Sequence, residues 1–178
     1  MFPDKQAKPF LNKKSLINLY YAFIYPYLLY CVEVWGNAAD IHLNHIFLLQ
    51  KKIVRIINYA HYKAHTQMIF INLEILPLQK IVYHRISLMM YKFNNDMLPT
   101  AIKELYTKNN EIHTYETRQS NHLHLPMGIH TKNFVYKSVQ IWNELANKGI
   151  DASVSLPVFK RKLKMYLLHN ELCLGYTA

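Results

Sequence analysis

Glycine, cysteine and acidic residues are all scarce in this sequence. Its 178 residues include 4 glycines and 7 prolines, too few for the repeated turns of an all-β fold. The few glycines are also scattered, which excludes a glycine-rich phosphate-binding loop. The 2 cysteines, Cys31 and Cys173, are too few for a disulfide framework. We therefore predict an intracellular protein, nuclear or cytoplasmic.

The shortage of carboxylates bears on catalysis. Asp4, Asp40, Asp96 and Asp151 stand far apart in the chain, whereas a two-metal polymerase or nuclease site needs clustered carboxylates. The sequence also lacks the G-x-S-x-G, C-x-x-C and H-E-x-x-H motifs. We predict no catalytic residue, no enzyme activity, no cofactor and no small-molecule substrate.

Ten histidines raise the question of a metal site. His61 and His65 are four residues apart, and His42 and His45 are three apart. A zinc site needs three or four ligands, and no cysteine or carboxylate stands at ligand spacing from these pairs. We interpret the histidines as surface or hydrogen-bonded side chains and predict no metal. Cys31 lies in an apolar segment and is interpreted as a small buried hydrophobic residue.

What the chain has in quantity is apolar residues and positive charge. Hydrophobic residues make up 51%, enough to form a core. Lysine and arginine number 21 against 11 carboxylates, which gives a formal net charge of +10. A surplus of this sign points to an acidic partner such as nucleic acid or an anionic membrane surface. The length fits one domain or one piece of a larger protein.

The uncharged run over residues 17–32 allows more than one interpretation. It is slightly shorter than the roughly 20 residues of a membrane-spanning helix, and its tyrosines are spread along it rather than gathered at its ends. Pro26 interrupts it in the middle. We favour a buried, proline-kinked core helix over a membrane span or a signal peptide. A small membrane-anchored protein that uses an apolar helix over 16–35 remains the alternative.

Helical spacing of apolar residues predicts an all-α fold, an irregular bundle of about six or seven helices. Asn12 or Ser15 is expected to cap a first helix that runs to Trp35, where Gly36 supplies a left-handed turn. Asp40 is expected to cap a second helix. Thr66, Pro77, Pro99, Phe134 and Ser153 or Ser155 mark the starts of the others. Residues 107–133 read as a polar loop with a short extended segment near 123–127.

Two clusters of positive charge lie on predicted helices. The first is Lys51, Lys52 and Arg55, and the second is Lys160, Arg161, Lys162 and Lys164. An ordinary solvated helix face would explain either cluster. The unbalanced net charge and the few acidic residues nearby favour contact with phosphates instead. No base-reading motif is visible, so we expect binding by backbone and shape rather than by sequence.

Six segments in order resemble the region that follows the catalytic palm in reverse transcriptases of jockey-like non-LTR retrotransposons. The first segment resembles the family pattern L-x-x-L-Y-x-x-x-I-x-P-x-L-x-Y-x-x-x-x-W-G. The matching residues are Leu16, Leu19, Tyr20, Ile24, Pro26, Leu28, Tyr30, Trp35 and Gly36. The other five segments are LLQKKIVRI, MYKFNNDMLP, YETR, IWNEL and FKRKLKMYLL. Ala146 departs from the family, which has proline there.

The resemblance implies a segment plan and a role. Residues 1–12 would be a flexible leader, 13–106 a thumb-like helical region, 107–133 the polar loop, 134–170 a C-terminal helical region and 171–178 a tail. The thumb of these enzymes grips the template-primer duplex, so RNA, DNA or their hybrid is the expected partner, and Arg118 joins the expected contact residues. The palm with its metal-binding aspartates is absent from the sequence. The chain therefore resembles a non-catalytic fragment, with a missing palm and fingers domain as a further expected partner. A relic without function, or a structural interaction piece, is the alternative.

Overall fold

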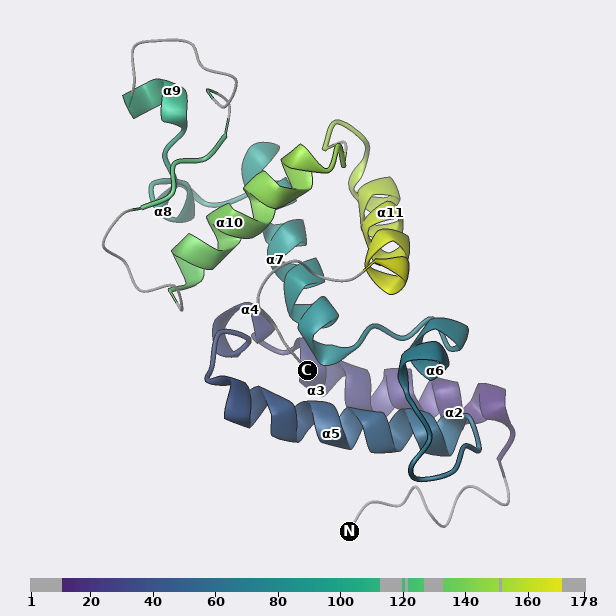
Figure 1. Cartoon of the computed structure of the whole chain (residues 1–178). Coiled ribbons are helices and arrows are strands. Elements are labelled where there is room, and N and C mark those ends of the chain that lie inside the picture. Colours follow the sequence, from purple (N-terminus) through teal and green to yellow (C-terminus); the bar gives the residue numbers. More distant parts are fainter. Residues whose placement is uncertain (1–10, 113–119, 121, 127–132, 151, 171–178) are drawn as a thin grey trace. The chain divides into compact units, whose positions relative to one another are not determined.

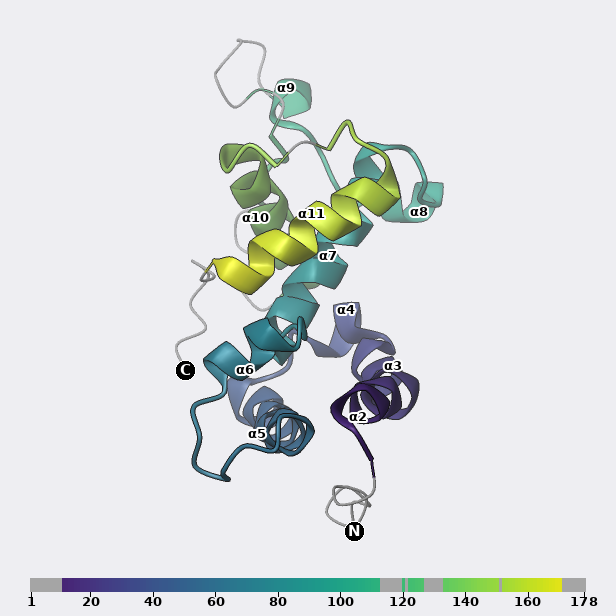
Figure 2. The ribbon, with the colours of Figure 1, turned by 90° about the vertical axis from the view of Figure 1, so that its right-hand side faces the viewer.

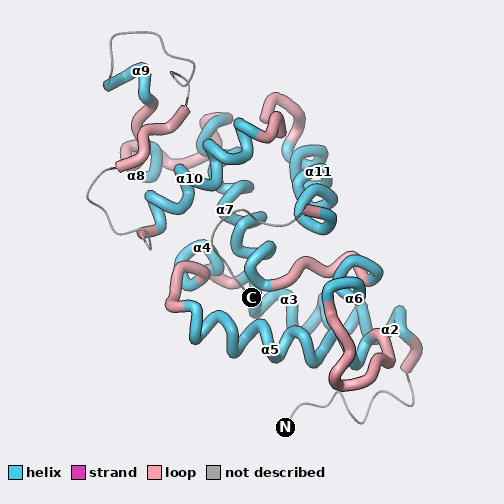
Figure 3. Tube along the Cα trace, viewed as in Figure 1, coloured by secondary structure: helices cyan, strands magenta, loops and turns pink. Residues whose placement is uncertain are grey.

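A computed structural model describes residues 11–112, 120, 122–126, 133–150 and 152–170 (Figure 1). Over these residues the chain forms helices and loops and no strand, which confirms the predicted all-α fold (Figure 3). The chain divides into two compact units. Unit 1 comprises Met1–Val82 and Lys164–Ala178, and unit 2 comprises Tyr83–Leu163. The division falls within two helices, α7 (Leu78–Asn94) and α11 (Leu156–His169).

Two antiparallel rows of helix form most of unit 1 (Figures 1 and 2). The second row is a single long helix, α5 (Asp40–Ile57), which lies beside the first row in both views. A short helix, α6 (Gln67–Asn72), packs on α5 through the rings of Phe47 and Phe70, whose centroids are 6.2 Å apart. The first row consists of α2 (Lys13–Leu19), the π-helical segment η1 (Tyr20–Ile24), α3 (Tyr25–Leu29) and α4 (Val32–Trp35).

Pro26 explains the π-helical segment in the first row. Proline has no backbone N–H, so the carbonyl of Ala22 loses its α-helical donor and faces the pyrrolidine ring. The backbone N–H of Tyr25 instead bonds to the carbonyl of Tyr20, five residues back. This wider turn lets the chain continue as α3 without a clash. The predicted disturbance at Pro26 is therefore present, as a change of helix type.

The first row then breaks where the sequence predicted a continuous helix. Tyr30 is extended and Cys31 is left-handed, with φ 49°. Cys31 is also exposed, so its interpretation as a buried hydrophobic residue was wrong. The prediction for Gly36 was wrong as well, since its φ is −64°. Glycine is required at position 36 by crowding, because a Cβ atom there would lie 2.5 Å from the Val32 carbonyl oxygen and 2.7 Å from a Val82 side-chain carbon.

Side chains on one face of each helix row form the core of unit 1. Leu16, Tyr20, Leu28 and Val32 are buried in the first row. The opposite side of that row is exposed: Phe23 and Tyr27 have 66% and 80% of their surface accessible. The expected buried core helix over 17–32 is therefore buried on one side only. No described helix is both long enough and apolar enough to cross a membrane.

Gln50 satisfies three polar groups inside unit 1. Its side chain is buried, and its Nε2 donates to the Tyr20 hydroxyl at 3.1 Å and to the Leu76 carbonyl at 2.9 Å. Its Oε1 accepts from the Leu78 backbone N–H at 2.8 Å. Leu78 is the first residue of α7, where backbone N–H groups have no partner within the helix. One buried amide thus joins both rows to the start of the next helix.

Unit 2 is built on α10 (Phe134–Asn147) together with parts of α7 and α11. Asn133 caps α10 by accepting from the Val135 N–H at 2.8 Å. The rings of Tyr91 and Phe159 lie 4.6 Å apart, and the Tyr106 hydroxyl is 2.9 Å from that of Ser138. Two short helices, α8 (Thr100–Lys103) and α9 (Asn109–Ile112), precede α10.

The extended segment predicted near 123–127 is present only as a single pairing within the described residues. Leu123 forms an isolated antiparallel bridge with Lys108 and is buried. Asn143 of α10 holds it by accepting from its N–H at 3.1 Å and donating to its carbonyl at 2.9 Å. Leu123 therefore anchors this part of the polar loop to α10. Met127 lies outside the described residues.

Helix ends were predicted with mixed success. As predicted, Asn12 caps α2 by accepting from the Ser15 N–H at 2.9 Å. Gly149, which follows α10, is left-handed with φ 67°. The prediction that Asp40 caps the second helix was wrong, because Ala39 precedes α5 and no side chain bonds there. The described chain has more helical segments than the six or seven expected, chiefly because the first row is divided.

Candidate nucleic-acid interface

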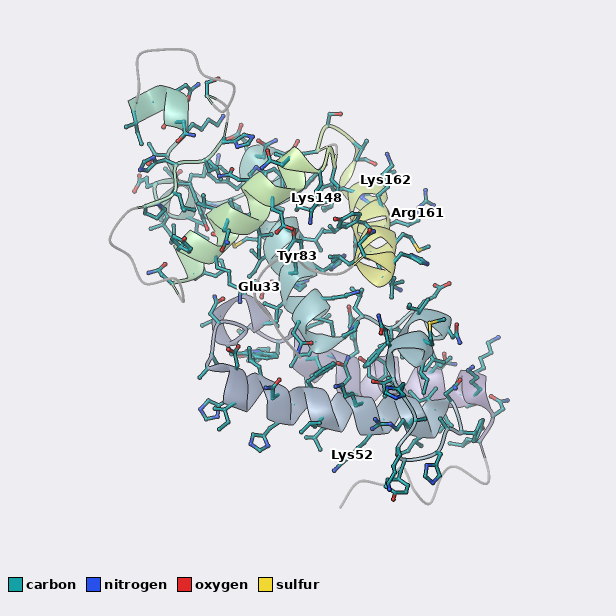
Figure 4. All side chains as sticks on the ribbon, in the orientation of Figure 1. Glu33, Lys52, Tyr83, Lys148, Arg161 and Lys162 are labelled. Atoms are coloured by element: carbon teal, nitrogen blue, oxygen red, sulfur yellow. The ribbon has the colours of Figure 1, made fainter. Side chains whose placement is uncertain are left out.

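The cluster predicted on the second helix lies on one surface of α5. Lys51 and Arg55 are four residues apart and Lys52 and Arg55 three apart, so their side chains are neighbours on the helix. Lys52 is exposed and points away from the α5 ribbon (Figure 4). Lys51 is half-buried, with its Nζ 4.2 Å from the centroid of the Phe47 ring. The structure therefore brings these three cations together.

Arg55 also organises the loop that follows α5. Its Nε donates to the Ala64 carbonyl at 2.9 Å, and its own carbonyl accepts from the Ala60 N–H at 2.9 Å. Tyr59 makes the turn between them with φ 53°. The guanidinium group has five N–H donors, of which this loop uses one. Arg55 can therefore hold the loop and still donate to a phosphate.

Two long-range hydrogen bonds bring the start of α2 to the same place. Lys13 Nζ donates to Asn58 Oδ1 at 2.9 Å, and the Tyr59 hydroxyl donates to the Leu11 carbonyl at 2.5 Å. Lys13 is exposed, so its ammonium group adds to the charge at the C-terminal end of α5. Positive charge at this end also interacts favourably with the helix dipole.

The loop itself carries an aromatic side chain beside a further cation. Tyr62 is 70% exposed, and Lys63 Nζ lies 5.4 Å from the centroid of its ring. The His61 ring is 4.5 Å from the same ring, centroid to centroid. We call Lys13, Lys51, Lys52, Arg55 and Lys63 the α5 basic surface.

No carboxylate forms an ion pair with the α5 basic surface in the part of the chain that the structure describes. The two ion pairs seen there, Lys103–Asp96 and Lys148–Glu144, both belong to unit 2. Within residues 11–82 and 164–170, eight lysines or arginines stand against three carboxylates. Those carboxylates are Glu33, Asp40 and Glu74. The charge of this surface is therefore not neutralised locally.

The cluster predicted on the last helix is less coherent. Lys160, Arg161 and Lys162 of unit 2 are exposed, and the latter two project outward from α11 (Figure 4). Successive residues on a helix do not face one another, so these three side chains spread around α11. Lys164 belongs to unit 1 and is half-buried. This helix offers exposed charge without a single compact surface.

Part of the α5 basic surface, and the aromatic side chain beside it, was not predicted from the sequence. Arg118, which was expected to contact nucleic acid, lies outside the described residues. Lys13, Tyr62 and Lys63 were not predicted. The histidine spacing of HYKAH suggested only metal ligands, although a tyrosine next to a lysine also suits a contact with nucleic acid.

Most of the histidines that the structure describes lie at the surface. His42, His45, His61 and His65 are all exposed. His84 is buried in unit 2, with its Nε2 3.4 Å from the Lys160 carbonyl. Among the described residues, no group of three or more histidine, cysteine, aspartate or glutamate side chains has the arrangement of a metal site.

Comparison of the chain with family models, with curated proteins and with solved structures gives no match.

Proposed function

We propose that the chain binds nucleic acid through its phosphate backbone, without sequence preference, at the α5 basic surface. The observation that carries the proposal is a set of neighbouring cations with no carboxylate paired to them among the described residues. Such a surface attracts phosphates by Coulomb interaction and by release of the counterions condensed on the nucleic acid. The exposed Lys160, Arg161 and Lys162 would add weaker contacts.

The resemblance to jockey-like reverse transcriptases supports a more specific form of this proposal. In that form the chain is a non-catalytic C-terminal fragment of an RNA-directed DNA polymerase, and residues 13–106 correspond to its thumb. The expected ligand is then a template-primer duplex, an RNA–DNA hybrid included. A palm and fingers domain would complete the enzyme, so the chain by itself is not expected to polymerise.

A titration against salt tests the general proposal. Fluorescence anisotropy of a labelled primer-template duplex should show binding that weakens as salt rises, with a slope of about −0.9 per phosphate contacted. Replacing Lys51 and Lys52 together by glutamate should weaken binding to unrelated sequences equally. Affinity that is absent, or that does not change with salt, would contradict the proposal.

The exposed side of the first helix row favours a second candidate function. Phe23, Tyr27, Tyr30 and Val34 all belong to the first row, and all are exposed. Several large exposed hydrophobic side chains on neighbouring segments are typical of a surface that packs on another protein domain. The chain would then be a structural interaction piece. Size-exclusion chromatography with light scattering tests this, because such a surface should cause self-association that Tyr27→Ser with Tyr30→Ser reduces, whereas a monomer at all concentrations would count against it.

A further inference from the structure

We infer that the loop after α5 is a stacking platform for an unpaired base, so that single-stranded nucleic acid is the preferred ligand of the α5 basic surface. The inference rests on the general form of the proposed function, phosphate binding at the α5 basic surface, and it names a ligand class other than the duplex that the resemblance implies. It starts from Tyr62, a large aromatic side chain that is 70% exposed. The ring lies beside the α5 basic surface rather than in a core.

The neighbours of Tyr62 suit a nucleotide. Lys63 Nζ lies over one face of the ring, 5.4 Å from its centroid, so a base would stack on the other face and have this cation within reach of its phosphate. The His61 ring, at 4.5 Å and tilted by 48°, extends the aromatic surface. An exposed aromatic ring next to positive charge is the combination by which proteins bind single strands without reading their sequence.

Hydrogen bonds fix the backbone on both sides of Tyr62 before any ligand arrives. Arg55 Nε bonds the Ala64 carbonyl at 2.9 Å, and the Ala64 N–H bonds the His61 carbonyl at 2.9 Å. The Lys63 N–H also approaches His61 Nδ1 at 3.3 Å. These bonds close the loop on both sides of the ring. A loop that is already ordered loses less conformational entropy on binding, so the stacking energy is retained as affinity.

The geometry favours a single strand over a duplex for a simple reason. In a duplex each base is covered by its neighbours, and only the backbone and groove edges are accessible. An unpaired base has a free face that fits the Tyr62 ring. A duplex would contact only the cations of the α5 basic surface, and the Tyr62 ring would add nothing to its affinity.

The test compares two oligonucleotides that carry the same number of phosphates. One is an oligothymidylate of about 12 nucleotides, a length within the site sizes of single-strand-binding proteins, and the other is an abasic strand of equal length. The full chain should bind the oligothymidylate more tightly. Tyr62→Ala should lower that affinity by about 5- to 150-fold and leave abasic binding unchanged, since one stacked base is worth about 1–3 kcal/mol.

Two matched variants sharpen the result. Tyr62→Phe keeps the ring and should bind as the wild type does, and Met97→Ala removes an exposed apolar side chain from unit 2, with no expected effect. Equal affinity of the wild type for both strands, or an unchanged affinity of Tyr62→Ala for oligothymidylate, would overturn the stacking inference alone. If the wild type binds neither strand nor the duplex, the proposed function fails, and the inference fails with it.

Discussion

Replacing Gln50 by leucine should destabilise the protein more than any change on the surface of α5. Gln50 is 2% exposed and joins the Tyr20 hydroxyl, the Leu76 carbonyl and the Leu78 N–H. Leucine has a similar volume and is apolar, so it should not leave a large cavity. It does leave these three polar groups without their partner. The loss therefore measures the hydrogen bonds rather than the packing.

The size of the effect follows from the number of groups stranded. A buried donor or acceptor that loses its partner costs about 1–3 kcal/mol, so the two backbone groups alone should cost about 2–6 kcal/mol. Adding Tyr20→Phe to Gln50→Leu removes the third stranded group and should recover about 1 kcal/mol. A domain has only about 5–15 kcal/mol of total stability, so the loss should be large in any denaturation experiment.

Urea unfolding followed by circular dichroism measures the change. With a slope of about 1–3 kcal/mol per molar, a loss of about 2–6 kcal/mol should lower the urea midpoint of Gln50→Leu by about 0.7 M or more. Asn44→Leu is the matched control, because Asn44 lies exposed on the same helix and its change should stay within about 0.5 kcal/mol. A Gln50→Leu variant as stable as the wild type, with the Leu78 amide equally protected from hydrogen exchange, would refute this reasoning.

Two further predictions concern packing and pH. Gly36→Ala should cost about 1–3 kcal/mol in urea unfolding, because the new Cβ would lie 2.5 Å from the Val32 carbonyl oxygen and 2.7 Å from a Val82 side-chain carbon. In a Val82→Ala background the same change should cost less, since one of the two contacts is then relieved. Full stability of the single Gly36→Ala variant would contradict the crowding. Burial raises the pKa of the Tyr20 hydroxyl, as it does that of Tyr21 and of Tyr106. The unfolded chain therefore loses these protons first, so the stability they contribute is complete below pH about 10 and falls as pH rises above it. As pH rises above about 10, the urea midpoint should drop while tyrosinate absorbance rises. Tyr20→Phe should reduce this drop in the midpoint. A midpoint that stays constant to high pH would show that these hydroxyls titrate as in the unfolded chain.

Local chemistry made part of the fold predictable. Asn12 caps α2 because its side chain needs only the N–H three residues on, and the cations of α5 share a surface because helical spacing fixes that. The break at Cys31 was not predictable, since no glycine or asparagine marks the left-handed residue.

Of the candidate site, the sequence predicted the cations that lie on one helix and not the residues that other segments bring to it. Lys51, Lys52 and Arg55 could be found because they lie on one helix. Lys13 reaches this surface through its bond to Asn58, 45 residues away, and Tyr62 lies near it because Arg55 ties the following loop to α5 at Ala64. Contacts between distant parts of a chain leave no local signal in its sequence.

The salt dependence of binding in two charge-neutralised variants tests the central claim most directly. Lys52→Gln with Lys63→Gln removes two cations of the α5 basic surface, and Lys92→Gln with Lys108→Gln removes two exposed lysines of unit 2. With a single-stranded ligand, the slope of log K against log salt should become shallower by about 1.4 in the first variant, because each lost phosphate contact removes about 0.7. In the second variant the slope should stay as in the wild type. Equal slopes in both variants would contradict the assignment of phosphate binding to α5.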